Sequence, residues 1–219
     1  MSIGQWLAGG FFVACLALFV FQLPHAIRIW LTYTGAGRRR QEDVTGRAPD
    51  PEPDTVERIA ILATLGYRPV GATRVRLPSK EWFSRILVAD SGESYAIVDS
   101  TSPTSGLTGF YTAWPDGQWI GTFHPYGDSY ERPGLQLRVH TGTLEGAVSA
   151  HRSWVDGLRA DHGDPRPVDR MPDVLALDAD YRQRFGGGEL RRPLIRALTP
   201  TAIALVATVA TLYLFATTR

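Results

Sequence analysis

The sequence contains a single cysteine, Cys15, and this excludes two common kinds of site. One thiol cannot form an intramolecular disulfide. Because Cys15 lies in an apolar run near the N-terminus, no thiolate zinc site can form in the polar part of the chain. The lack of disulfides is compatible with a reducing compartment.

Motifs of several large enzyme classes are also missing. The chain has no G-x-S-x-G nucleophile elbow, no H-E-x-x-H zinc motif and no glycine-rich loop between a predicted strand and a helix. Its triple glycine, 186–188, follows a predicted helix, and we interpret it as a hinge. These absences remove the commonest motif-bearing enzymes, so we predict no cofactor.

Acidic and basic residues are distributed unevenly along the chain. The formal net charge is +1 over 219 residues, yet residues 41–189 hold 22 acidic and 15 basic side chains, a net charge of −7. An acidic domain disfavours nucleic acid as a partner, because neutralisation of phosphates supplies most of that affinity. We therefore expect no nucleic-acid partner.

Long apolar runs occur near both ends of the chain. Residues 6–23 contain no charge, and a membrane crossing takes about 20 apolar residues. Trp6 and Trp30 are spaced by about 36 Å of helix, which suits one indole at each interface. Pro24 predicts a kink or break. No Lys or Arg precedes the run and no clean cleavage site follows it, so an uncleaved anchor is favoured over a signal peptide.

The second apolar run, 198–216, predicts a second crossing. Small residues recur at intervals of three or four in both runs, a spacing that lets helices approach closely in lipid. Packing of the two spans on each other accounts for these small residues, and contact with another membrane protein is the alternative. They are Gly10, Ala14 and Ala17 in the first run, and Ala204, Ala207, Thr208 and Thr211 in the second.

Six arginines flank the spans on their inner sides. These collar arginines are Arg38, Arg39 and Arg40 after the first run, and Arg191, Arg192 and Arg196 before the second. The positive-inside rule places them, and the domain between them, in the cytoplasm, with both termini across an inner or plasma membrane. The collar arginines can also bind anionic headgroups of the bilayer.

The segment between the spans predicts an α+β domain with an antiparallel sheet and flanking helices. A helix is expected from Asp54, which with Glu57 forms a capping-box pattern, and another begins after Thr143 or Thr141. Six strands are predicted at 70–77, 83–89, 94–98, 108–114, 118–123 and 135–140. This order predicts an antiparallel sheet covered on one face, with a last helix at 172–185.

The resulting organisation has five segments. They are a transmembrane or interfacial helix at 1–34, a flexible tether at 35–53, the α+β domain at 54–185, a Gly/Arg hinge at 186–197 and a transmembrane helix at 198–219.

Aromatic residues on the predicted 108–123 hairpin are the strongest candidates for a binding surface. Alternating strands turn successive side chains to opposite faces, so one face of an uncovered sheet would expose rings. The candidate surface consists of Tyr111, Trp114, Trp119 and Tyr126. The alternative is that helices cover both faces and these rings are core.

Histidines and carboxylates offer no clear metal site. Asp161, His162 and Asp164 lie close together, but a solvated helix end explains them. Asp178 and Asp180 would face different directions on a helix. Asp90 and Glu93 bracket a predicted turn, where short polar residues are expected. We therefore predict no metal and no catalytic residue.

The leading hypothesis is a two-pass membrane protein with a non-enzymatic cytoplasmic domain that acts as an accessory or interaction subunit. A membrane-tethered enzyme acting on a lipid-derived or envelope substrate is the alternative, and it predicts a pocket where His124 or His140 meets a carboxylate. A small-ligand sensor is a third possibility.

Overall fold

The computed structural model describes residues 3–33, 40–77, 80–99, 106–189 and 191–217. The chain divides into two units, which we describe separately. The helical unit comprises residues 1–39, 77–79 and 186–219, and the sheet unit comprises residues 40–76 and 80–185.

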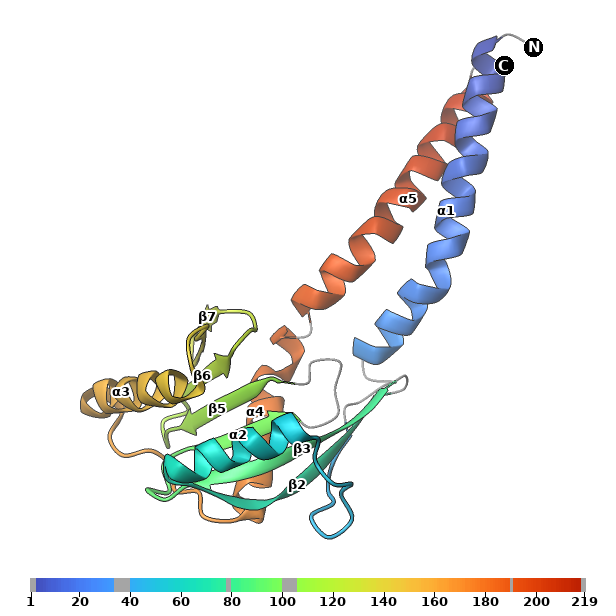
Figure 1. Ribbon diagram of the computed structural model, residues 1–219. Helices are drawn as coiled ribbons and strands as arrows, with labels where there is room; N and C mark the ends of the chain where they lie inside the picture. The colour runs from blue at the N-terminus through green and yellow to red at the C-terminus, as the bar shows by residue number, and fades with distance from the viewer. Residues whose placement is uncertain (1–2, 34–39, 78–79, 100–105, 190, 218–219) are drawn as a thin grey trace. The chain divides into compact units, whose positions relative to one another are not determined.

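The helical unit contains α1 (Ile3–Tyr33) and α5 (Arg191–Thr217), which pack along each other (Figure 1). The less exposed face of α1 carries residues at intervals of three and four, namely Phe12, Cys15, Phe19, Gln22 and Ala26. Gln22 accepts a hydrogen bond from the Thr201 hydroxyl at 3.4 Å. α1 continues through Pro24, where the sequence predicted a kink or a break, so of the two outcomes the break is absent.

The sheet unit is built on one sheet of eight strands. They are β1 (Arg40–Asp43), β2 (Tyr67–Leu77), β3 (Lys80–Ala89), β4 (Tyr95–Asp99), β5 (Thr108–Ala113), β6 (Trp119–His124), β7 (Tyr130–Arg132) and β8 (Leu135–Val139). The spatial order is β1-β2-β3-β4-β5-β6-β8-β7. The pairs β1–β2, β3–β4, β4–β5, β5–β6 and β7–β8 are antiparallel, and β6 and β8 run parallel. The fold is therefore α+β with a mostly antiparallel sheet, as predicted.

Helices cover both faces of this sheet, whereas the sequence predicted that helices cover one face. α2 (Pro53–Thr64) and α3 (Leu144–His162) pack on one face, where Leu62, Leu87 and Phe110 share a core with residues of α3. α4 (Met171–Glu189) packs on the other face, in a core with Ile86 and Trp119. Sequence periodicity identifies apolar faces of strands but does not show which helix meets them.

The tether predicted at 35–53 is partly a strand. β1 pairs with β2, Val44 is buried, and Glu42 forms an ion pair with Arg74 at 2.5 Å. β1 has the sequence RQED, in which apolar and polar residues do not alternate. The sequence therefore contains no local pattern that predicts this strand or its pairing with β2. Residues 35–39 of the predicted tether lie outside the described residues.

Two further helix ends differ from the prediction. α2 begins after Glu52 with Pro53 in its first turn, and no side-chain cap forms, so Asp54 lies inside the helix instead of capping it. α4 continues to Glu189, so Gly186–Gly188 of the predicted hinge are helical. Each glycine inside a helix lowers helix stability by about 1 kcal/mol relative to alanine. The adjoining turns of α4 offset this loss. The Thr143 cap is confirmed, because its hydroxyl accepts from Gly146 N at 3.1 Å.

Candidate functional site

The four aromatic residues of the candidate surface do not form one exposed face. Trp114 and Trp119 are both fully buried, on opposite faces of the sheet. Trp114 packs with Val155 of α3 and donates its indole N–H to the carbonyl of Gly163 at 3.0 Å. Trp119 packs against Tyr181 of α4, with ring centroids 5.2 Å apart. The two tryptophans are core residues because a helix covers each face.

Tyr111 and Tyr126 are also separated from each other. Tyr111 stacks on Tyr95 at 5.4 Å between ring centroids and contacts the edge of Tyr181. Tyr126 is the exposed member of the set, with 41% of its surface accessible. Partial burial, and then the nearby charge of Asp99, raise the pKa of the Tyr126 phenol. A single exposed ring is common on protein surfaces and does not make a binding site.

The collar arginines fall mostly beyond what the structure describes. Arg38 and Arg39 lie outside the described residues. Arg40 begins β1, and Arg191, Arg192 and Arg196 lie in α5, but the side chains of these four also lie outside the description.

The small residues of the two apolar helices have different surroundings. Ala204, Thr208 and Thr211 of α5 are buried, whereas Gly10, Ala14 and Ala17 of α1 are exposed in this chain. Ala207 is half-buried. The two predicted faces therefore do not meet each other as a pair.

The two histidines named for an enzyme lie together but meet no carboxylate. The ring centroids of His124 and His140 are 6.5 Å apart, and His124 Nδ1 lies 3.2 Å from the backbone oxygen of His140. Within the described residues, neither ring has an ion pair with Asp or Glu.

The DHGD segment ends α3 as expected of a helix terminus. α3 runs unbroken through Gly157, and His162 Nδ1 lies 2.6 Å from Asp116 Oδ2. The amide of Gln118, and then His162, lower the pKa of Asp116.

No three His, Cys, Asp or Glu side chains in the described ranges are grouped to hold a metal ion. Asp178 and Asp180 each pair with arginines, Arg182 and Arg184.

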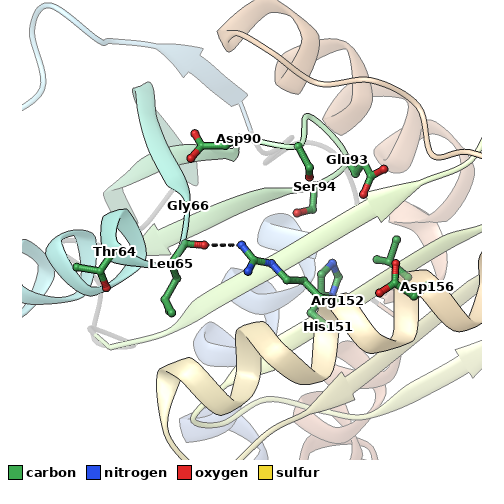
Figure 2. A pocket seen from close by; sticks show the side chains of 11 residues that line it. Thr64, Leu65, Gly66, Asp90, Glu93, Ser94, His151, Arg152 and Asp156 are labelled. Atoms are coloured by element: carbon green, nitrogen blue, oxygen red, sulfur yellow. Dashed lines mark hydrogen bonds between the residues drawn. The ribbon is translucent and has the colours of Figure 1, made fainter.

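The sheet unit has an open cavity of about 430 Å³ where three elements meet. The end of α2, the β3–β4 turn and the middle of α3 form its walls (Figure 2). Its lining residues are Thr64, Leu65, Gly66, Asp90, Ser91, Glu93, Ser94, His151, Arg152, Val155 and Asp156. A volume of this size is in the range that holds small ligands.

His151 forms the base of the cavity and is fully buried. Its Nδ1 lies 2.9 Å from the Thr122 hydroxyl and its Nε2 lies 3.1 Å from the Thr112 hydroxyl. Burial, and then the charge of Arg152, lower its pKa to about 3. The imidazole is therefore neutral at physiological pH, and both nitrogens are already hydrogen-bonded.

Arg152 crosses the cavity toward the C-terminal end of α2. Its guanidinium donates to the carbonyl of Leu65 (Figure 2). The guanidinium also lies 5.7 Å from the centre of the Tyr67 ring. The Tyr67 hydroxyl shares a hydrogen bond with Ser94 at 2.9 Å, and burial raises the pKa of Tyr67. Arg152 thus caps the helix with one nitrogen, while a guanidinium has five N–H donors in all.

The carboxylates around the cavity differ in their partners. Glu93 is paired with Arg159 at 2.8 Å, and Arg159 also binds Asp164 at 2.6 Å. Asp156 lies 3.8 Å from Arg159 and is largely exposed. The carboxylate of Asp90 has no hydrogen bond or ion pair with any described residue. The cavity therefore contains one unpaired carboxylate, one loosely paired carboxylate and one guanidinium with spare donors.

Gly66 makes this arrangement possible. Its φ of +77° favours glycine, and a Cβ there would lie 3.3 Å from Asp90 Oδ2 and 3.6 Å from Arg152 Nη2. The Asp90 amide also donates to the Gly66 carbonyl at 2.8 Å.

Sequence reasoning missed this cavity because its residues come from three distant segments. Asp90 and Glu93 were explained as turn residues, and Arg152 on a predicted helix face gave no signal of its own.

No protein-family model matches the chain, and no solved structure matches it. The chain is similar to the NH(3)-dependent NAD(+) synthetase of Deinococcus radiodurans, with 31% identity over 124 residues. The match covers 57% of this chain, and the chain spans 40% of the length of that relative.

Proposed function

We propose that the chain is a two-pass membrane protein that holds its sheet unit at the cytoplasmic face, as a non-enzymatic accessory or interaction subunit of a membrane assembly. The observation that carries this proposal is the apolar surface of α1. Residues Gly9–Ile27 are long and apolar enough to cross a membrane, and only 6% of that stretch is buried. A core helix of a soluble protein would be mostly buried.

Exposed side chains in this stretch are large and apolar. Phe21 is 84% exposed, and Phe11, Val13 and Val20 are each more than half exposed. Such a surface is unfavourable in water, at roughly 25 cal/mol for each Å² of apolar area. Lipid chains remove that cost.

α5 supports a second crossing less strongly. Its apolar part in the described residues, Leu198–Tyr213, extends about 24 Å. Leu214, Phe215 and Ala216 continue the apolar sequence and bring it to about 28 Å, close to a hydrocarbon thickness of about 30 Å. The hydroxyls of Thr208 and Thr211 bond to carbonyls one turn earlier, so they need no water.

The orientation follows from the collar arginines, which favour the cytoplasmic side. The non-enzymatic role is supported by the cavity, where burial lowers the pKa of His151 to about 3, too low for an effective general base near neutral pH. The similarity to an NAD(+) synthetase carries no proposal, because the chain spans less than half of that protein.

Cysteine labelling of the full chain in sealed vesicles tests the topology. On a Cys15→Ser background, Ser149→Cys marks the sheet unit, while Ser2→Cys and Thr218→Cys mark the termini. A membrane-impermeant maleimide should label Ser149→Cys from the cytoplasmic side, and both termini from the opposite side. Labelling of Ser149→Cys from the outer side contradicts the orientation, and labelling of Thr218→Cys from the same side as Ser149→Cys contradicts the second crossing.

Native mass spectrometry of the tagged chain, extracted from its own membranes, tests the accessory role. We expect a membrane protein to co-purify in fixed stoichiometry. Purification of the chain alone after chemical cross-linking in intact membranes would contradict the role, while leaving the topology unaffected.

A further inference from the structure

We infer that the cavity between α2, the β3–β4 turn and α3 binds a free α-amino acid with a basic side chain. This site is independent of the membrane topology proposed above, because every residue that forms it belongs to the sheet unit.

The first step is the pair of opposite charges beside Gly66. A Cβ on Gly66 would lie 3.3 Å from Asp90 Oδ2 and 3.6 Å from Arg152 Nη2, so both groups lie beside Gly66. They do not form an ion pair with each other. A molecule with an ammonium and a carboxylate on one carbon can reach both groups at once, with its ammonium at Asp90 and its carboxylate at Arg152.

The backbone adds to the preference for an ammonium beside Asp90. The C-terminal end of α2 carries a partial negative charge, and residues 64–66 from this end line the cavity. Arg152 donates to the Leu65 carbonyl through Nη2, the nitrogen that lies beside Gly66. The rest of its guanidinium is available to hold a carboxylate.

The carboxylate of Asp156 favours a ligand with a basic side chain. Asp156 lies four residues after Arg152 on α3, and residues at this spacing share one face of a helix. Its nearest cation, Arg159, is 3.8 Å away and is already bound to Glu93 and Asp164. A ligand held by Asp90 and Arg152 would therefore place a cationic side chain next to Asp156. Val155 also lines the cavity and can cover the aliphatic part of the ligand.

Calorimetric titration of the full chain in detergent micelles with L-lysine tests this site. Two analogues separate the contacts: cadaverine lacks the α-carboxylate, and 6-aminohexanoate lacks the α-ammonium. We expect L-lysine to bind about 10–100-fold more tightly than either analogue, since each loses a charge-assisted hydrogen bond. Absence of L-lysine binding, or equal binding of cadaverine, would overturn the inference.

Variants locate the binding on the protein. Asp90→Asn keeps the shape of an exposed side chain that has no partner to lose, so folding is expected to be unchanged, and affinity should fall about 10-fold or more. Asp128→Asn, an exposed residue outside the cavity, is the matched control and should bind L-lysine as the parent does. Unchanged affinity in Asp90→Asn would place the binding elsewhere and contradict the assignment.

Asp156 is tested by comparing L-lysine with L-alanine. L-lysine should bind more tightly than L-alanine to the parent chain, and Asp156→Asn should reduce this difference. Equal affinities for the two amino acids in the parent chain would contradict the basic side chain.

Discussion

The imidazole of His151 lies 2.9 Å from the hydroxyl of Thr122, measured from Nδ1 to Oγ1, in a fully buried position on α3. Thr112 meets the other ring nitrogen at 3.1 Å. A neutral imidazole has one N–H donor and one acceptor nitrogen, and a hydroxyl can serve either. The two threonines, on neighbouring strands β5 and β6, therefore satisfy the ring completely and join α3 to the sheet.

The burial of His151 predicts a pH dependence of stability. Its pKa is about 3 in the folded chain and about 6.5 when unfolded, so the unfolded state takes up a proton first as the pH falls. The contribution of this group is fully present above pH 6.5 and is lost as the pH falls from 6.5 toward 3. We expect the free energy of unfolding to fall by up to about 1.4 kcal/mol per pH unit below pH 6.5.

Denaturant titrations of the full chain in detergent at several pH values measure this slope. The His151→Gln variant should lose most of it between pH 6.5 and 5.5, above the range where carboxylates titrate. His140→Gln, which removes a half-buried imidazole, is the control and should keep it. An unchanged slope in His151→Gln would contradict the prediction.

Removing one hydroxyl from His151 should be costly. Thr122→Val keeps the shape of the side chain but leaves Nδ1 without a partner, at a cost of about 1–3 kcal/mol in the free energy of unfolding. Thr141→Val changes an exposed residue and should shift stability by less than about 0.5 kcal/mol. Thermal unfolding followed by tryptophan fluorescence compares the two variants, and equal midpoints would contradict the role of Thr122.

The two buried tryptophans allow a matched comparison. Trp114 donates to Gly163, whereas the indole N–H of Trp119 is buried without a hydrogen-bond acceptor among the described residues. Replacement by Phe removes similar volume from both sites. Trp114→Phe should therefore be more destabilising than Trp119→Phe by about 1 kcal/mol, because it alone removes a hydrogen bond, the one from the indole N–H to the Gly163 carbonyl. Denaturant titration of both variants measures the difference, and the reverse order would contradict the assignment.

Two glycines should respond to alanine with opposite signs. Gly157 lies inside α3 with no atom near the position of a Cβ, so Gly157→Ala should stabilise the domain by about 1 kcal/mol. Gly66 has φ of +77° and Asp90 at 3.3 Å, so Gly66→Ala should destabilise it by about 1 kcal/mol or more. Shifts of the same sign in the thermal midpoint would contradict this reading.

Much of the sheet unit was predictable because strands and helices leave local patterns. The six predicted strands match β2–β6 and β8 within a few residues, and Thr143, one of the two predicted caps, is the residue that caps α3. β1 and β7 were missed because short edge strands lack an alternating pattern of their own. The triple glycine was interpreted as a hinge because glycine has a low helix propensity. Propensity alone does not include the stability that adjoining helical turns provide.

The sequence by itself determined the apolar helix near the N-terminus, the α+β class and the acidic character of the middle of the chain, since each depends on composition and on local periodicity. The tertiary structure decided which aromatic residues are buried, that both faces of the sheet are covered, and that Asp90, Arg152 and Asp156 share one cavity. These depend on contacts between segments far apart in the chain. No local pattern encodes which of them meet, because packing selects among many possible pairings only when the whole sheet unit is assembled.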